Sequence, residues 1–279
     1  MTLLQIIVLA GVQGLAELLP VSSSAHVILA EKAMGLDPTS PDMTLLLVML
    51  HTGTMFAVIA YFWRSWRETY FASGRALRRN GLHIALATIA TGVVGLALLQ
   101  GIKHVLAGGA PDFEIEHLFG NTKLMAASLT AAGALIILSS RRSATAAGAL
   151  GASDALWIGA VQGLCLPFRG LSRSGATISS AMLLGVARRR AEEFSFALAV
   201  VLTPAVIVKE GYRFCQAHAG AAGVSEMLRL LGPSLLGMGL SFLAGLVALR
   251  WLSRWLEQGR WYLFGIYCLV AALVVLVAA

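Results

Sequence analysis

Residues 11–29 read GVQGLAELLPVSSSAHVIL, and residues 159–179 read GAVQGLCLPFRGLSRSGATIS. Both stretches contain VQGL, then a proline, then serines and other small residues, and then an apolar run. The copies lie about half the chain apart and differ in charge, because the first holds a glutamate and a histidine and the second holds two arginines. The two copies share the proline and the small residues but differ in charge. This pattern predicts two structurally equivalent segments with different functions.

The composition indicates the class of protein that carries this repeat. The chain is 58% apolar and 13% charged, with a mean hydropathy of +0.79. Soluble domains are about a quarter charged, so an integral membrane protein is predicted. The net charge of +7 is then expected from basic loops on the cytoplasmic side, and nucleic-acid binding is not expected. The cysteines lack metal-ligand spacing, so we expect neither disulfides nor zinc.

Six stretches are apolar and long enough to cross a bilayer, which takes about 20 residues. They are residues 43–63, 83–104, 118–140, 193–213, 231–252 and 260–279. Two further apolar segments, 2–35 and 153–190, are interrupted by proline, serine and charged residues. Irregular backbone at membrane depth is tolerated only inside protein or beside a water-filled cavity. Each segment is therefore predicted to be a re-entrant hairpin of two short helices.

The basic residues favour this topology. With both segments re-entrant, most of the 21 Lys and Arg residues fall on one side of the membrane, as the positive-inside rule expects. Each half then has one hairpin and three spans, and the odd number of spans inverts the second half. We predict an all-α polytopic membrane protein with ten helices and an inverted-topology repeat. It forms a single domain over 1–279, with repeat one at about 1–142 and repeat two at about 150–279.

The first break places polar groups on both sides of a proline. Gln13 and Glu17 are four residues apart and share one face of a helix that Pro20 ends. Ser22 or Ser23 can cap the helix that follows. Glu17 is suited to binding a divalent cation through oxygen, or to orienting a histidine.

A histidine follows these serines by about one turn. His26 can therefore approach Ser22 or Ser23, and a hydroxyl beside an imidazole is the usual arrangement of an activated nucleophile. The alternative is that the serines are helix caps and His26 is a satisfied polar residue of the bundle. Ionisable residues within a membrane segment favour the functional interpretation.

The second break is suited to an anion. Ser172 or Ser174 can cap a helix that starts near Gly175, and the free N–H groups at a helix start attract phosphate. Arg173 adds a fork of donors that fits a phosphate group, and Thr177 adds a hydroxyl one turn later. One copy thus offers carboxylate, hydroxyl and imidazole, and the other offers an anion clamp. This combination predicts hydrolysis of a phosphate ester or anhydride.

Four stretches carry a resemblance to a known family: GLAELLPVSSSAH, HTGTMFAVIAYFWR, SRSGATIS and EFSFALAV. Together they resemble the bacterial undecaprenyl-diphosphate phosphatases, the bacitracin-resistance family, over essentially the whole chain. The resemblance implies removal of one phosphate from a C55 lipid diphosphate, which recycles the lipid carrier for cell-wall synthesis and confers bacitracin resistance. It also implies the same fold of two hairpins and six spans, a divalent metal (Mg²⁺ or Ca²⁺), and the bacterial cytoplasmic (inner) membrane.

The resemblance also implies roles for residues of both breaks. Gln13 and Glu17 occupy the family's E/Q-xxx-E motif, which is expected near the metal and the diphosphate. The serine–histidine motif and the arginine motif are occupied by Ser22, Ser23 and His26, and by Ser172, Arg173, Ser174 and Thr177. Catalysis is assigned to Glu17, Ser23, His26 and Arg173, and substrate binding to the others. Ser23 is favoured as the nucleophile with His26 as base, and direct attack by His26 stays open.

Some positions depart from the family or have two interpretations. Ala25 stands where the family usually has glycine, and PFRGLSRS replaces PGxSRS, which adds Arg169. Arg169 either contacts phosphate or lies at the cytoplasmic mouth of the hairpin, and the second is favoured. His51, in HTGT, either lines the site or has a structural role, and the structural role is favoured. Glu192 and Glu193 are expected to start a helix rather than bind metal.

Other functions give inverted repeats or similar motifs. A transporter or lipid flippase is the main alternative, although a carrier needs no nucleophile beside a base. A phosphatase of the phosphatidic-acid type would need a K-x6-RP stretch, which the sequence lacks. The charge bias predicts that the site opens to the outer side. No cleavable signal pattern is expected, and a homodimer is left open.

Overall fold

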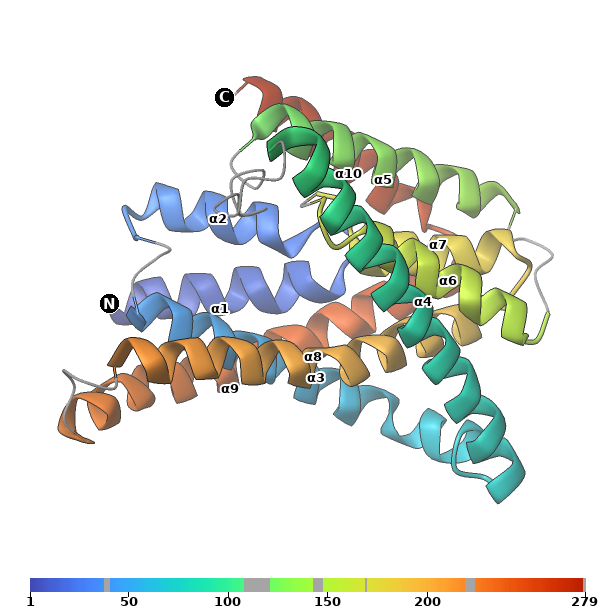
Figure 1. Cartoon of the computed structure of the whole chain (residues 1–279), viewed down its shortest axis with the longest axis horizontal. Helices are drawn as coiled ribbons and strands as arrows, with labels where there is room; N and C mark the ends of the chain where they lie inside the picture. The colour runs from blue at the N-terminus through green and yellow to red at the C-terminus, as the bar shows by residue number, and fades with distance from the viewer. Residues whose placement is uncertain (38–40, 108–120, 143–147, 169, 219–223, 278–279) are drawn as a thin grey trace. The chain divides into compact units, whose positions relative to one another are not determined.

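A computed structural model describes residues 1–37, 41–107, 121–142, 148–168, 170–218 and 224–277. Ten helices lie within these residues (Figure 1). They are α1 (Leu3–Leu18), α2 (Ser23–Ala33), α3 (Pro41–Thr69), α4 (Gly74–Ala107), α5 (Thr122–Arg142), α6 (Ala152–Leu164), α7 (Arg173–Leu183), α8 (Arg188–His218), α9 (Val224–Glu257) and α10 (Tyr262–Val277). The predicted all-α class and the ten helices are confirmed for the described part of the chain.

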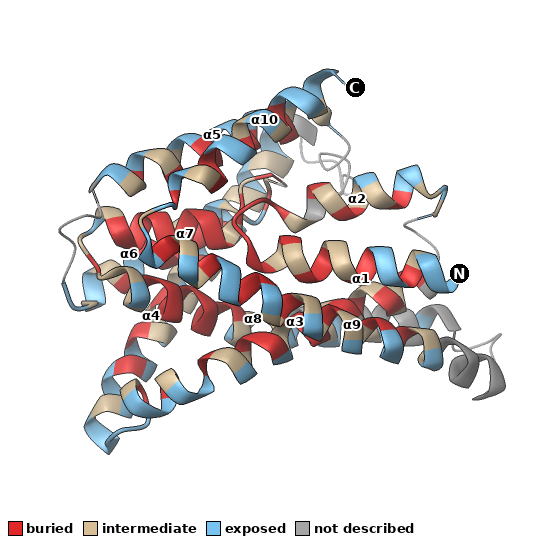
Figure 2. Cartoon of the chain, turned by 180° about the vertical axis from the view of Figure 1, so that it is seen from behind, coloured by how far each residue is buried: buried red, intermediate tan, exposed pale blue. Residues whose placement is uncertain are grey.

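Five helices are long and apolar enough to cross a membrane. These candidate spans are Met43–Thr69, Gly74–Val105, Thr122–Arg141, Arg188–Lys209 and Leu231–Glu257. They match five of the six predicted spans, although most run several residues further at one end or both. The sixth, predicted at 260–279, corresponds to α10, a shorter apolar helix of 16 residues. Large apolar side chains are exposed along α4 and α10, as expected for surfaces that face lipid (Figure 2).

Both predicted helix breaks are present. In the first, α1 ends at Leu18 and α2 begins at Ser23, and in the second, α6 ends at Leu164 and α7 begins at Arg173. The two helices of each pair pack against one another, so each pair forms a helical hairpin. Ser22 has a φ of 66°, the only positive φ of a non-glycine residue among those described. This left-handed conformation allows the chain to turn sharply after Pro20.

The described chain divides into two compact units. Unit one contains residues 1–19, 23–63 and 199–252, and unit two contains residues 20–22, 64–198 and 253–279. Helices α3, α8 and α9 contribute residues to both units. Each unit therefore combines segments from both halves of the sequence, and the boundaries of the predicted repeats stay a prediction.

In unit one, α1 lies close to α9 at the glycine of the first VQGL. A Cβ atom added to Gly14 would lie 2.6 Å from the Ala244 Cβ, 2.8 Å from the Ser241 carbonyl oxygen and 3.2 Å from the Gly245 nitrogen. The core beside this contact is formed by buried apolar residues of α1, α2 and α3: Ile6, Leu9, Ala10, Val27, Met43, Leu46 and Leu50. Close packing of this kind fixes α1, which carries the first motif.

In unit two, the glycine of the second VQGL makes the equivalent contact with α4. A Cβ atom added to Gly163 would lie 2.8 Å from the Thr91 carbonyl oxygen, 2.9 Å from the Val94 Cβ and 3.0 Å from the Gly95 nitrogen. In both units the glycine therefore lies against positions i, i+3 and i+4 of a long helix. Gln162, the glutamine of the second VQGL, is fully buried and donates a hydrogen bond to Thr91 Oγ1 at 3.1 Å.

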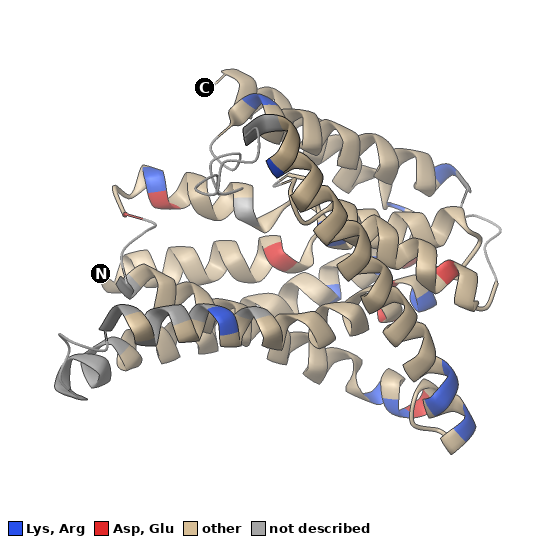
Figure 3. Ribbon diagram, in the orientation of Figure 1, with Lys and Arg blue, Asp and Glu red and all other residues tan. Residues whose placement is uncertain are grey.

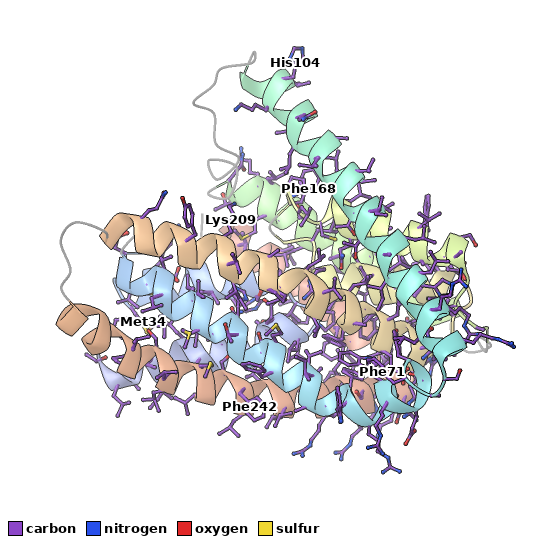
Figure 4. All side chains as sticks on the ribbon, turned by 60° about the horizontal axis from the view of Figure 1, so that its bottom comes forward. Met34, Phe71, His104, Phe168, Lys209 and Phe242 are labelled. Carbon is purple, nitrogen blue, oxygen red and sulfur yellow. The ribbon has the colours of Figure 1, made fainter. Side chains whose placement is uncertain are left out.

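Charged residues are sparse on the helices and gather at a few ends, such as the turn between α3 and α4 (Figure 3). Five exposed arginines lie around this turn: Arg64, Arg67, Arg75, Arg78 and Arg79. Phe71, which is 54% exposed, marks the turn in Figure 4. This basic end is the feature from which the sequence predicted a cytoplasmic loop.

Glu192 and Glu193 lie in the first turns of α8, so the prediction that they are near a helix start is confirmed. The structure also buries both. Glu193 accepts hydrogen bonds from Arg190 at 2.9 Å, from Arg189 at 3.2 Å and from Ser65 of α3, and Glu192 accepts one from Ser253 of α9. The two carboxylates thus join α8 to α3 and α9 within unit two.

The Arg190 side chain has a second task at this end of unit two. Its guanidinium lies 5.6 Å from the ring centre of Tyr70, a cation–π contact. Tyr70 is buried, and burial raises the pKa of its hydroxyl well above the usual value. The ring therefore stays neutral and supports the Arg190 contact.

Candidate functional site

A connected polar cluster in unit one contains most of the predicted residues of the first break. Glu17 Oε2 accepts hydrogen bonds from Ser23 Oγ at 2.6 Å and from Gln13 Nε2 at 3.2 Å. Gln13 Nε2 also lies 2.9 Å from His51 Nδ1, and His51 Nδ1 lies 3.8 Å from Glu17 Oε2. Four side chains from three helices thus meet around one carboxylate. We call these four residues the carboxylate cluster.

The local fold explains how these residues meet. Gln13 and Glu17 are one turn apart on α1, so their side chains lie on the same face. The break at Pro20 turns the chain back, and the first residue of α2, Ser23, reaches Glu17. His51 comes from α3. Gln13 is buried, whereas the Glu17 and His51 side chains are 19% and 38% exposed, so the cluster is accessible on their side.

The hydrogen bond of Ser23 adds detail to the predicted serine–histidine pair. The sequence paired the hydroxyl with His26, whereas the structure directs it to the Glu17 carboxylate. His26 is half-buried on α2, one turn after Ser23. The carboxylate can hold the hydroxyl in position, and the role of His26 as base stays a prediction. Ser22 is buried in the break itself, at its left-handed φ.

The predicted anion clamp of the second break lies in unit two. Ser172 caps α7, and its Oγ accepts a hydrogen bond from Gly175 N at 3.3 Å. Ser174 Oγ lies 3.3 Å from Ser172 Oγ, and Arg173 is the first residue of the helix. The prediction that a serine caps this helix is confirmed for Ser172. Arg169, the other arginine of this break, lies outside the described residues.

Thr177 was predicted to contact the substrate, but the structure buries its side chain. It is fully buried, its Oγ1 donates to the Arg173 carbonyl oxygen at 2.8 Å, and it lies 2.6 Å from Ser195 Oγ of α8. These bonds tie the first turn of α7 to α8. Thr177 can therefore position Arg173 by fixing its backbone, and direct contact with the substrate stays a prediction.

The short break after α1 is part of unit two. Residues 20–22 belong to this unit, where Pro20 accepts a hydrogen bond from Cys268 Sγ of α10 at 3.2 Å. A Cβ atom added to Gly175 would lie 3.1 Å from the Pro20 Cβ. The break that carries Ser22 thus packs beside the start of α7, the helix that carries Arg173.

The donor types of the carboxylate cluster fit a hard divalent cation. Glu17 offers a carboxylate and Gln13 a carboxamide oxygen, and Mg²⁺ and Ca²⁺ bind oxygen ligands. Among the described residues no group of three or more His, Cys, Asp or Glu side chains could hold a metal. Mg²⁺ commonly binds through one or two carboxylates together with substrate phosphates. The residues present therefore fit a cation that binds jointly with a diphosphate.

The sequence left the role of one residue near the site undecided and gave no role to another. His51 had two interpretations, and the structure places it in the carboxylate cluster; a histidine in an otherwise apolar span was the signal. Ser195 had no assigned role, and the structure bonds it to Thr177. Its signal was weaker, since a single serine in an apolar helix commonly bonds to its own backbone.

Comparisons with known proteins agree on one family. The family described as bacitracin resistance protein BacA matches residues 6–274. The chain is 62% identical to undecaprenyl-diphosphatase 2 of Acinetobacter baylyi, with 100% of this chain and 99% of the relative covered. It is 34% identical to the undecaprenyl-diphosphatases of Desulfosudis oleivorans and Verminephrobacter eiseniae, with 96% and 98% of this chain and 95% and 93% of the relatives covered. The chain therefore belongs to the bacitracin resistance protein BacA family.

Proposed function

We propose that this chain hydrolyses undecaprenyl diphosphate to undecaprenyl phosphate and inorganic phosphate. The observation that carries the proposal is the carboxylate cluster, in which Ser23 donates to Glu17 at 2.6 Å, with the half-buried His26 one turn later on α2. A hydroxyl held by a carboxylate, with a histidine one helical turn later as the proposed base, is suited to attack on phosphorus. The relatives named above are undecaprenyl-diphosphatases, which supports the same substrate for this chain.

Ser23 is the proposed nucleophile. Its Oγ attacks the terminal phosphorus, the P–O bond to the bridging oxygen breaks, and undecaprenyl phosphate leaves. Glu17 holds the hydroxyl before attack, and His26 takes its proton and later activates the water that releases phosphate from the serine. Direct attack by His26 stays an alternative, and a phosphohistidine would then form in place of a phosphoserine.

The start of α7 is proposed to hold the terminal phosphate. The capped helix presents backbone N–H groups to an anion, and the Arg173 guanidinium can bind two phosphate oxygens at once. Ser172, Ser174 and Ser22 are the hydroxyl donors of this part of the site. Stabilising charge on the phosphoryl oxygens in a water-poor site is the larger part of catalysis in phosphoryl transfer.

The cation is proposed to bind between the protein and the diphosphate. Glu17 and the Gln13 carboxamide oxygen would hold it, as Mg²⁺ or Ca²⁺, and the cation would neutralise charge on the diphosphate. Binding it would compete with Ser23 for the same carboxylate. The Ser23 hydroxyl is therefore expected to turn away from Glu17 when cation and substrate enter together.

We further propose that the two hairpins are re-entrant and that the chain is an inverted-topology repeat. The support is the matching contact of the two VQGL glycines, since Gly14 lies against Ser241, Ala244 and Gly245, and Gly163 lies against Thr91, Val94 and Gly95. Hairpins that turn back at membrane depth place their breaks where a polar site can form. The proposed setting is the bacterial inner membrane, with the site open to the outer side.

Hydrolysis is tested with purified protein and a long-chain prenyl diphosphate. Release of inorganic phosphate is expected, as is its loss with EDTA and its return when Mg²⁺ or Ca²⁺ is added in excess. The same protein in liposomes is assayed for movement of the lipid between leaflets. Movement without phosphate release would contradict the proposed function and favour a transporter.

The orientation is tested with a single cysteine in place of Asp37, which lies beyond the end of α2 and is exposed. The test uses a background in which the native cysteines are replaced by serine. An impermeant thiol reagent is expected to label intact spheroplasts at this position. Labelling only after the cells are opened would place the first hairpin on the cytoplasmic side and refute the proposed orientation.

A further inference from the structure

The bond between Gln13 and His51 determines which way the Gln13 carboxamide faces. A glutamine side chain can present either its oxygen or its NH₂ group to a neighbour, and the two arrangements have nearly the same shape. Glu17, when ionised, can only accept hydrogen bonds, so the 3.2 Å contact with Gln13 requires the NH₂ group on that side. The second N–H of the same group is then left for His51.

His51 completes this arrangement as an acceptor. Its Nδ1 lies 2.9 Å from Gln13 Nε2, so Nδ1 takes the second hydrogen and the ring proton sits on Nε2. The two bonds use both hydrogens of Gln13 Nε2 and leave Oε1 out of both. His51 Nδ1 and Glu17 Oε2 are 3.8 Å apart, beyond hydrogen-bond distance, so the Gln13 NH₂ group bridges the two side chains.

The backbone around His51 is anchored, which makes it suited to a positioning role. Ser241 Oγ of α9 donates to the Leu50 carbonyl oxygen at 3.0 Å, and Thr54 Oγ1 donates to the His51 carbonyl oxygen at 2.9 Å. Gly53 allows α3 to lie directly against the Met238 carbonyl of α9. A side chain on a fixed backbone can hold a mobile carboxamide, because little of its own freedom remains to be lost.

We propose that His51 is a positioning residue, which holds the Gln13 NH₂ group toward Glu17 so that Gln13 Oε1 is presented to a divalent cation and the diphosphate bound with it. The inference rests on the proposed function, in which Gln13 and Glu17 hold that cation. Without His51, the carboxamide can turn over and direct its NH₂ group toward the cation, which repels it. The result is weaker cation binding in the same fold.

The test compares His51→Asn with His51→Gln and His51→Leu. Asparagine places Oδ1 close to where the histidine has Nδ1, so it can accept from Gln13, whereas glutamine carries its polar atoms one carbon further out. His51→Asn is expected to stay within about threefold of wild type, and His51→Gln and His51→Leu to lose about tenfold in kcat/KM for phosphate release, as for one lost hydrogen bond. Thermal unfolding of each variant is measured in parallel.

Binding of Mn²⁺ together with methylene diphosphonate, a diphosphate analogue that is not hydrolysed, provides a readout that does not depend on turnover. Electron paramagnetic resonance of purified protein with this analogue is expected to show about tenfold weaker Mn²⁺ binding in His51→Gln and His51→Leu, and near wild-type binding in His51→Asn. If His51 had a purely structural role, the unfolding temperatures of the three variants would fall according to how much packing each one loses. Their Mn²⁺ affinities would then equal that of wild type.

Two further outcomes separate this inference from the proposed function. If wild type releases phosphate and all three variants equal it in kcat/KM and Mn²⁺ affinity, the His51 inference is wrong and the proposed function stands. If wild type releases no phosphate, the proposed function is wrong. In that case the Mn²⁺ titrations decide, because wild-type affinity in His51→Leu would overturn the positioning role as well. Should His51→Leu fail to fold, the His51→Asn and His51→Gln pair gives the same comparison.

Discussion

The glycine of the first VQGL is predicted to be essential for packing of α1 against α9. Replacing Gly14 by alanine would place a Cβ atom 2.6 Å from the Ala244 Cβ and 2.8 Å from the Ser241 carbonyl oxygen. Ordinary contacts for such atoms begin near 3.4 Å, so the helices would have to separate by several tenths of an ångström. Both atoms belong to α9, and neither is the end of a flexible side chain that could move aside. Overpacking of this kind costs about 1–3 kcal/mol.

Gly11 offers a matched control three residues earlier on the same helix. A Cβ atom added there meets nothing within 4 Å. Both substitutions gain the same helix propensity, about 1 kcal/mol for glycine to alanine, so the difference between the two variants isolates the overlap. Gly14→Ala is therefore expected to be about 1–3 kcal/mol less stable than Gly11→Ala.

The assay is unfolding of the purified protein in detergent, followed by tryptophan fluorescence. The midpoint of Gly14→Ala is expected below that of Gly11→Ala, and Gly163→Ala is expected to fall with it, because its overlap with Thr91 and Val94 is similar. Equal midpoints for Gly14→Ala and Gly11→Ala would refute the close approach of α1 and α9.

Three further predictions follow from single side chains. Ser22→Gly removes the cost of a left-handed serine and is expected to raise stability by up to about 1 kcal/mol, while loss of its hydroxyl lowers phosphate release; reduced stability would contradict the strained turn. Glu193→Gln weakens the bonds of a buried carboxylate with the exposed Arg189 and the half-buried Arg190 and is expected to cost about 1–3 kcal/mol in thermal unfolding, whereas an unchanged midpoint would argue against this anchor. Thr177→Val and Ser195→Ala are both expected to lower kcat for phosphate release and to cost about 1–3 kcal/mol in thermal unfolding, because each leaves a buried hydroxyl without its partner, and full activity in folded Thr177→Val would exclude its role in fixing the start of α7.

Features set by local chemistry were predictable from the sequence. Pro20 cannot continue α1, Ser172 is a preferred cap, and the apolar stretches have the length of membrane spans, so the ten helices and both breaks followed from residue type and spacing. Gln13 and Glu17 were paired correctly because a separation of four residues places side chains on one helix face.

Features set by contacts between distant segments were not predictable. Two adjacent glutamates at a helix start are usually exposed to solvent. Glu192 and Glu193 are buried because α8 packs against other helices, which the sequence does not reveal. Ser23 reaches Glu17 because the break turns in one particular way, and a left-handed serine is not a usual turn signal. The partner of Gln13 depends on how α3 packs on α1, which spacing along one helix cannot give.

The most direct test of the account is phosphate release from undecaprenyl diphosphate by Glu17→Ala and Arg173→Ala, each compared with wild type at saturating Mg²⁺. Glu17 carries the carboxylate cluster and Arg173 the anion site, so each substitution is expected to lower kcat/KM by about 100-fold or more. Their unfolding temperatures are expected to stay near that of wild type, since neither side chain is fully buried. Wild-type rates in either folded variant would contradict the assignment of these residues to the site.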